Sequence, residues 1–202
     1  MAALWTYPRG GSPRPTLLGD MKGAASVANL YGQNIAAAES MTSALQYWAH
    51  APADLRRVID LEFAYGINRP VIHSAVHQPL DDTKPGLSLF IVGQYFNRHE
   101  TWADMAKPWI DYIARNSFML QQGRNHADVA YFHGEDTPLS AQYADRALAD
   151  VPTSYAYDFV NTDALLNLLK VDKGELTAPS GARYHVLYLG NASRSMTLPV
   201  LR

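Results

Sequence analysis

Cysteine is absent from this chain of 202 residues. Its absence excludes disulfide bonds, thiolate metal sites and a cysteine nucleophile. Long apolar runs are absent too, because none approaches the ~20 residues that a membrane-spanning helix needs. Residues 1–16 lack the charged-then-apolar order of a signal peptide. Charge is sparse, with a net charge of −2 and no polybasic run. We therefore expect neither a nucleic acid nor a membrane surface as the partner.

Two sequence signatures are missing as well, one of nucleotide binding and one of serine hydrolases. No G-x-G-x-x-G or Walker sequence occurs, so the chain has no nucleotide-binding fingerprint. No G-x-S-x-G elbow occurs, so a serine hydrolase has no support. The first absence counts against one alternative, an unrelated doubly wound α/β enzyme with a small-molecule site.

Residues 20–135 alternate between helical and strand patterns. Helical spacing of small or apolar residues predicts three helices: 20–31, 52–65 and 102–122. Short apolar segments predict three strands: 34–40, 70–76 and 128–132. Gly32 is a plausible helix stop, and Pro108 places a kink or the true start of its helix near Lys107. The alternation favours parallel strands joined by helical crossovers. The Gly- and Pro-rich residues 1–16 are typical of a loop.

The pattern changes after Pro152. Strands are predicted at 155–160, 174–176 and 183–189, the last two around a Pro-Ser-Gly turn. A helix is predicted at 161–170 with Asn161 as its N-cap, and residues 196–202 resemble the opening of another helix. Asp158 is most simply interpreted as a turn or cap residue.

Polar side chains follow each of the three predicted strands. They are Glu39 and Ser40, then His73, His77 and Gln78, then His133, Glu135 and Asp136. In α/β folds chemistry collects at the carboxyl ends of parallel strands. Two carboxyl groups facing one cleft suit glycoside hydrolysis, in which one is the acid and the other the base or nucleophile. Burial beside Tyr131 and Phe132 would raise the pKa of a carboxyl toward the range that an acid needs.

Each of these residues also has a simpler interpretation. Glu39 or Glu135 could be a helix-start residue or a surface charge. His73 and His77 have the i, i+4 spacing of a helical metal site, but that spacing falls here on a strand and a loop, which favours sugar contacts or loop packing. Trp102 could present an apolar face to a sugar, whereas Trp109, on the same helical face, is expected in the core.

Several collinear segments, spanning about Asp20 to Gly190, resemble one known family. They are DMKGAASVANLYGQNIAAAESMTS, FAYGINRPVIHSAVHQP, RHETWADMAKPWIDYIARNSFMLQQGR, ADVAYFHGEDTP and YAYDFVNTDALLNLLKVDKGELTAPSGARYHVLYLG. They are similar to the late catalytic region of α-L-rhamnosidase-like proteins of glycoside hydrolase family 106. The resemblance implies an inverting, multidomain enzyme with a (β/α)8 barrel flanked by β-rich domains. Such enzymes remove terminal α-L-rhamnose from plant glycans or glycosides, and the family is reported to hold calcium at the sugar site.

The resemblance also suggests roles for individual residues. Glu39 fits the general acid, and Glu135 fits the base that activates water. Glu100 fits a calcium ligand or the base, so the order of acid, base and metal ligand among the three stays open. The sugar-contacting residues that it implies are His73, His77 and Gln78, and Trp102 is added to these candidates for its apolar face.

A full barrel needs roughly 200 residues or more, and the predicted elements of this chain supply only about three βα units. We therefore expect this chain to hold only late βα units of a partial (β/α)8 (TIM) barrel. Residues 1–150 are expected to form that C-terminal part of the barrel, and residues 151–202 the beginning of a second α/β module. The rest of the enzyme is then required for activity, and the full-length relative is expected in the periplasm or outside the cell. The alternative is a non-catalytic carbohydrate-binding remnant.

Overall fold

The computed structural model describes residues 2–136, 138–139, 148–190 and 193–202. It is an α/β structure that divides into two compact units. The first unit comprises Met1–Pro13 and Ala37–Gln121, and the second comprises Arg14–Ala36 and Gln122–Arg202. Among the described residues no helix is both long and apolar enough to cross a membrane. The boundary expected after residue 150 concerns the complete enzyme and stays a prediction.

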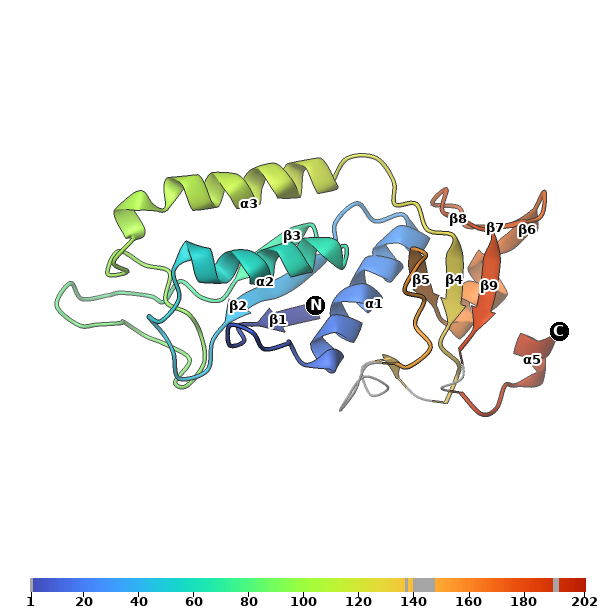
Figure 1. The fold of residues 1–202 in the computed structure, drawn as a ribbon, viewed down its shortest axis with the longest axis horizontal. Helices are drawn as coiled ribbons and strands as arrows, with labels where there is room; N and C mark the ends of the chain where they lie inside the picture. The colour runs from blue at the N-terminus through green and yellow to red at the C-terminus, as the bar shows by residue number, and fades with distance from the viewer. Residues whose placement is uncertain (1, 137, 140–147, 191–192) are drawn as a thin grey trace. The chain divides into compact units, whose positions relative to one another are not determined.

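The first unit contains a parallel sheet of three strands. They are β1 (Ala2–Trp5), β2 (Ala37–Thr42) and β3 (Arg69–Ile72), and β2 lies in the middle (Figure 1). The strands predicted at 34–40 and 70–76 are thus confirmed, with shifted ends. The loop expected for residues 1–16 is wrong at its start, because Ala2–Trp5 pairs with β2. A four-residue segment has little pattern of its own, and here the neighbouring strand supplies the hydrogen bonds.

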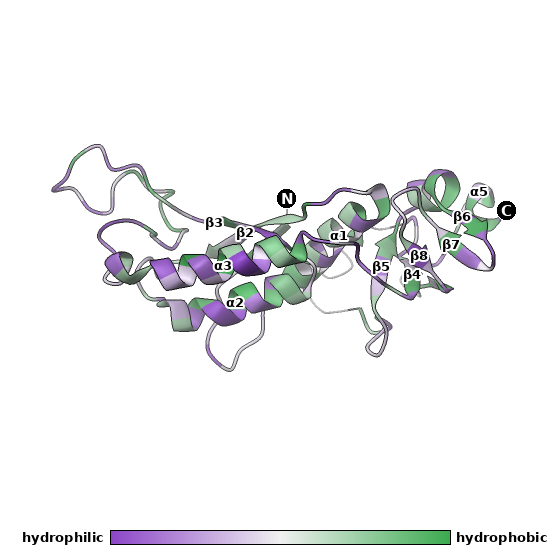
Figure 2. Ribbon diagram, turned by 90° about the horizontal axis from the view of Figure 1, so that it is seen from above, coloured by the Kyte–Doolittle hydropathy of each residue, from purple (hydrophilic) through white to green (hydrophobic). Residues whose placement is uncertain are grey.

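Two helices cover one face of this sheet. They are α2 (Pro52–Ala64) and α3 (Lys107–Leu120), the latter preceded by a 3₁₀ turn at Ala103–Met105. A proline stands at the first turn of each, which confirms the start predicted near Lys107. Both helices carry alternating polar and apolar colours (Figure 2). Their apolar faces form a core with the end of β2, and its buried members are Met41, Leu55, Ile59, Trp109 and Ile113.

The second unit begins with α1 (Pro15–Tyr31), which packs against β5 (Tyr157–Val160). The helix ends where predicted, at Gly32, whose φ of 74° is left-handed and accessible to glycine without strain. The Ser26 hydroxyl accepts a hydrogen bond from the backbone N–H of Phe159 at 2.9 Å. Side-chain packing and this bond attach the helix to its strand.

The second unit has its own parallel sheet. In it β4 (Val129–Phe132) lies between β5 and β9 (Val186–Leu189). The predicted strand at 128–132 is therefore confirmed. The three strand-end clusters, however, do not share one sheet, because in the described chain β2 and β3 pair in the first sheet and β4 in the second. Chain order does not fix sheet order, because only roughly two-thirds of sequential strands are neighbours in a sheet.

The remaining elements of this unit are short. They are a π turn at Ala164–Leu168, an antiparallel sheet of β6 (Lys170–Asp172), β7 (Glu175–Thr177) and β8 (Arg183–Tyr184), and α5 (Leu198–Leu201). The side chain of Asn161 accepts a hydrogen bond from Ala164 N–H at 2.8 Å. This is the bond expected of the predicted N-cap, although the helix that follows is shorter than residues 161–170.

Candidate functional site

The carboxyl end of β2 carries the best-developed polar cluster of the first unit. Thr42 Oγ1 donates a hydrogen bond to Glu39 Oε1 and lies 3.1 Å from His73 Nδ1. The distance from His73 Nδ1 to Glu39 Oε1 is 3.8 Å. The Glu39 and His73 side chains are 31% and 23% exposed, so both are accessible to a ligand. The structure thus brings together two of the residues that the sequence singled out, and adds Thr42.

Glu39 faces away from α2. Its neighbour Ser40 points the other way and donates a hydrogen bond of 2.6 Å to Oε2 of Glu62 on that helix. Because successive side chains of a strand alternate between the two faces, Glu39 lies on the face opposite the helices. In a (β/α)8 barrel the face away from the helices is the inner face, and active sites lie where that face ends, at the carboxyl ends of the strands.

Glu62 is a buried carboxyl that the sequence reasoning missed. It lies on the apolar face of α2, one step beyond Leu55, Val58 and Ile59 at helical spacing, and it is fully buried. Burial raises the pKa of Glu62 to about 8, and the Ser40 hydroxyl only partly opposes this shift. A charged residue at i+7 on an otherwise apolar stripe was the signal that could have found it.

A second polar group surrounds Glu100, which is 6% exposed. Glu100 Oε2 accepts a hydrogen bond from Gln94 Nε2 at 3.3 Å, and Oε1 accepts one from Thr101 N–H at 2.9 Å. Gln94 also exchanges backbone hydrogen bonds with His73 and Ser74. Glu100 is therefore linked through Gln94 to the same end of the sheet as Glu39.

A pocket of about 250 Å³ adjoins Glu100. Its apolar lining residues are Phe96, Trp102, Ala103, Ala106 and Ile110, and its polar ones are Asn97 and Glu100. Within the described residues, Asn97 Nδ2 and Trp102 Nε1 are buried without a hydrogen-bond partner. Buried donors are normally paired, so these two unpaired donors are unusual features of residues that line the pocket. Trp109 lies in the core at 6% exposure, as expected.

His77 and Gln78 lie in the long segment after β3. His77 is exposed, and its carbonyl accepts a hydrogen bond from Leu87 N–H at 2.8 Å. Among the described residues Gln78 Nε2 is buried without a partner. Of the residues predicted to contact sugar, only His73 lies in the Glu39 cluster, and Trp102 lies in the Glu100 pocket.

Glu135 and Asp136 bind the C-terminal segment of the second unit. Both oxygens of Glu135 accept hydrogen bonds from Thr197, at 2.6 Å from its N–H and 3.0 Å from its hydroxyl. Asp136 accepts from Ser195 Oγ and from Arg194 N–H, and these bonds lower the pKa of its carboxyl. In this structure the strand-end carboxylates therefore anchor residues 193–197.

Asp158 is a buried strand residue, which corrects its interpretation as a turn or cap. It forms an ion pair with Lys22 at 3.4 Å and accepts from Asn29, Asn125 and Tyr184 at 2.9, 3.2 and 3.0 Å. Alternation explains the error: Tyr157 and Phe159 face one side of β5, so Asp158 must face the side that α1 covers. The residue attaches four segments of the second unit to one another.

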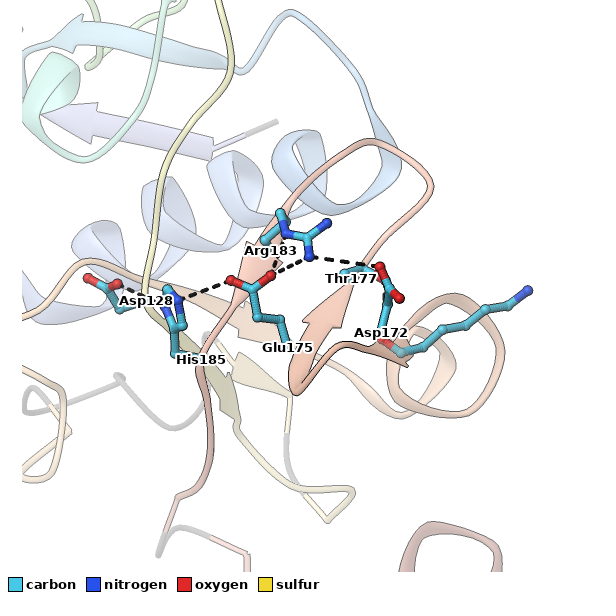
Figure 3. Close-up of polar contacts among 7 residues, drawn as sticks. Asp128, Asp172, Glu175, Thr177, Arg183 and His185 are labelled. Atoms are coloured by element: carbon cyan, nitrogen blue, oxygen red, sulfur yellow. Dashed lines mark hydrogen bonds and ion pairs between the residues drawn. The ribbon is translucent and has the colours of Figure 1, made fainter.

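A further charged cluster lies on the surface of the second unit (Figure 3). Glu175 accepts from Arg183, whose guanidinium lowers the pKa of that carboxyl. His185 lies between two carboxylates, with Nδ1 3.2 Å from Asp128 and Nε2 3.0 Å from Glu175. The cluster joins β7, β8 and the entry to β4, so packing of the antiparallel sheet accounts for it.

The described residues do not by themselves supply a complete set of calcium ligands. Calcium takes six to eight oxygen ligands, whereas Glu100 has one carboxylate already engaged by Gln94 and Thr101. Gln94 Oε1 is a buried acceptor without a partner in the described chain. No group of three or more acidic or histidine side chains is arranged there for a metal. The described residues therefore supply two candidate calcium ligands at this place, the Glu100 carboxylate and the Gln94 amide oxygen, and calcium binding by the longer enzyme stays a prediction.

An accessible carboxylate beside an imidazole, at the carboxyl end of parallel strands, fits a glycoside hydrolase. Comparison with known families makes this specific. The chain belongs to the glycoside hydrolase family described as alpha-L-rhamnosidase, whose pattern matches residues 1–202.

Two relatives show how much of such a protein the chain represents. A rhamnosidase structure from Novosphingobium sp. PP1Y is 63% identical, with a TM-score of 0.96 over 100% of this chain and 19% of its own. A protein of Formosa agariphila named "Putative beta-glucuronidase" is 40% identical over 192 residues, which are 94% of this chain and 15% of that protein. The chain thus spans less than a fifth of either relative.

Proposed function

We propose that this chain forms part of the catalytic barrel of a longer enzyme that hydrolyses terminal α-L-rhamnosyl residues of plant glycans or glycosides with inversion. That longer protein is called the full-length enzyme from here on. The observation that carries the proposal is the Glu39–Thr42–His73 cluster. It lies at the carboxyl end of parallel strands, on the face away from the helices, in a chain of the rhamnosidase family. The two parallel sheets with helical connections support the proposal, because late βα units of a barrel would have this alternation of strands and helices.

In the proposed reaction, Glu39 donates its proton to the glycosidic oxygen as the bond from that oxygen to the anomeric carbon breaks. A water oxygen attacks the same carbon from the opposite face, and Glu135 takes the proton that the water loses. The products are free rhamnose of inverted configuration and the alcohol. Glu39 is left ionised and Glu135 protonated, and proton exchange restores both. For Glu135 to act, its contacts with Thr197 must open, so Glu100 is the competing base.

The pocket beside Glu100 favours a neutral deoxy sugar as substrate. Rhamnose carries a methyl group at the position where a glucuronic acid carries a carboxylate. The pocket is largely apolar, is lined in part by Glu100, and has no lysine or arginine among its described lining residues. A second carboxylate there would be repelled and unpaired. The methyl group would instead lie against Phe96 and Trp102, and hydroxyls would meet Asn97 and Glu100.

Leaving-group dependence tests the acid role directly. In the full-length enzyme, Glu39→Gln should lower kcat for phenyl α-L-rhamnoside by about 10²–10⁴-fold. It should lower kcat far less for the 2,4-dinitrophenyl glycoside, because that leaving group departs without a proton. Glu135→Gln should lower kcat for both substrates. Equal losses for both substrates in Glu39→Gln would remove Glu39 as the acid.

Glu62→Gln is the matched control. It changes the same residue type on the helix-covered side of the sheet, and it should leave kcat unchanged near pH 7. If Glu100→Gln, rather than Glu135→Gln, abolishes turnover of both substrates, then Glu100 is the base.

A carbohydrate-binding role without cleavage is the second candidate. It is favoured by the engagement of both Glu135 oxygens with Thr197. Calorimetric titration of the 202-residue chain with rhamnose, beside an assay for released rhamnose, distinguishes the two functions. Binding by the chain, with no release even by the full-length enzyme, would favour the binding role.

A further inference from the structure

The end of β2 contains a bulge at Met41. This residue has a φ of 66°, which is unusual for a side chain of its kind. The register with β1 slips there, since Leu4 lies opposite Ser40 whereas Trp5 lies opposite Thr42. Met41 is therefore the extra residue, and an extra residue reverses the alternation beyond it.

The bulge places Thr42 on the face of Glu39. In a regular strand residues three apart face opposite sides. Here Ser40 and Met41 both face α2, through Glu62 and through Leu55 with Ile59. Glu39 and Thr42 consequently share the other face, where Thr42 Oγ1 donates to Glu39 Oε1. The left-handed conformation of Met41 thus places the Thr42 hydroxyl beside Glu39, the candidate acid.

The Thr42 hydroxyl has one proton and is cut off from solvent. Thr42 is 1% exposed, and its Oγ1 lies 3.1 Å from His73 Nδ1. When the hydroxyl donates to an ionised Glu39, it can accept from a protonated Nδ1 of His73. When Glu39 is protonated, the same three groups can bond in the reverse order. Transfer from the imidazolium to the carboxylate leaves a neutral imidazole and a carboxylic acid, with no change in total protons.

We propose that Thr42 is a positioning residue for Glu39, holding its carboxyl by a hydrogen bond and connecting it to His73 Nδ1 so that Glu39 regains its proton after each turnover. This inference rests on the proposed acid role of Glu39. It adds an uncharged residue that lies beyond the end of the strand predicted at 34–40, so the sequence pattern did not indicate it. The backbone of Thr42 is itself fixed, because its carbonyl accepts from Thr6 N–H at 2.9 Å.

The test removes only the hydroxyl. In the full-length enzyme, Thr42→Val keeps the β-branched shape, whereas Thr42→Ser keeps the hydroxyl. With phenyl α-L-rhamnoside, Thr42→Val should lower kcat about 10- to 100-fold, the loss expected for a hydrogen bond to a charged group, and KM should change less than about threefold. With the 2,4-dinitrophenyl glycoside, which needs no proton, kcat should stay within about threefold. Thr42→Ser should restore most of the activity. Thr42→Ala replaces the valine variant if that variant does not fold.

Ser40→Ala is the matched control, because it removes a hydroxyl–carboxyl hydrogen bond from the opposite face of the same strand. It should leave kcat unchanged with both substrates. Native kcat in Thr42→Val, or an equal loss with both substrates, would overturn the inference. Glu39→Gln measured beside it separates the two proposals. If Glu39→Gln retains turnover, the proposed acid role fails. If Glu39→Gln is impaired and Thr42→Val is not, only the role of Thr42 fails.

Discussion

Among the described residues, each of the two units has one carboxyl group with no exposed surface, Glu62 in the first and Asp158 in the second, and the two groups have different surroundings. In the second unit, Asp158 is paired with Lys22 and accepts three further hydrogen bonds. In the first, Glu62 has one donor, the Ser40 hydroxyl, and in the described chain its Oε1 has no partner. One donor does not offset the loss of hydration, which is why burial raises the pKa of Glu62 to about 8. The two buried carboxyl groups therefore differ in the number of hydrogen-bond donors around them.

The largest effect is expected at Asp158. Asp158→Asn leaves the largely buried Lys22 ammonium without its partner, so the free energy of unfolding should fall by about 3–5 kcal/mol. Urea denaturation of the 202-residue chain measures it. Asp172→Asn is the control, because Asp172 is 56% exposed and lies 3.9 Å from Arg183. It should cost less than about 0.5 kcal/mol. Equal losses in the two variants would contradict the claim that the contacts of Asp158 hold the segments of the second unit together.

The next effect is the pH dependence that Glu62 confers. The folded chain keeps a proton on Glu62 up to about pH 8, whereas the unfolded chain releases it near pH 4.3. The stabilising contribution is therefore full below pH ~4 and falls by about 1.4 kcal/mol per pH unit between roughly pH 5 and 8. Above pH 8 it levels off. Glu62→Gln should remove this slope from unfolding free energies measured across that range, and an unchanged slope would assign it elsewhere.

The smallest effect comes from removing one hydroxyl donor from each carboxyl. Tyr184→Phe takes one of several donors from Asp158 and should cost about 1.5–3 kcal/mol, the range for a bond to a charged group. Ser40→Ala takes the donor from Glu62 and should cost about 0.5–1.5 kcal/mol near pH 7, the range for neutral partners. Denaturation of both variants under one condition compares them directly. A larger loss in Ser40→Ala would reverse the comparison.

Local sequence patterns predicted most of the helices and the principal strands. Proline at the start of α2 and α3 and glycine after α1 have a direct effect on the backbone, so these boundaries were readable. The strand β1 was missed because four residues carry too little pattern. Glu62 and Asp158 were not recognised as fully buried carboxyl groups because neither was assigned to a face of its element, although Glu62 continues an apolar helical stripe and Asp158 alternates with Tyr157 and Phe159.

The candidate site was predictable only in part. Parallel strands place polar residues at one edge, and this logic correctly brought Glu39 and His73 together. It did not reveal Thr42, because the bulge at Met41 reverses the alternation on which the prediction depends. It also treated β3 and β4 as members of one row, whereas each pairs within its own sheet. Sheet order is set by contacts between distant segments, which a local pattern does not contain.

The most direct test of the central claim is a crystal structure of the full-length enzyme with rhamnose bound. We expect the Glu39 carboxyl to lie within hydrogen-bond reach of the oxygen on the anomeric carbon, and the Glu39 and Glu135 carboxyl groups to be about 6.5–9.5 Å apart across the sugar. Rhamnose bound away from Glu39, or carboxyl groups separated by well over ~12 Å with no water held between them, would contradict it.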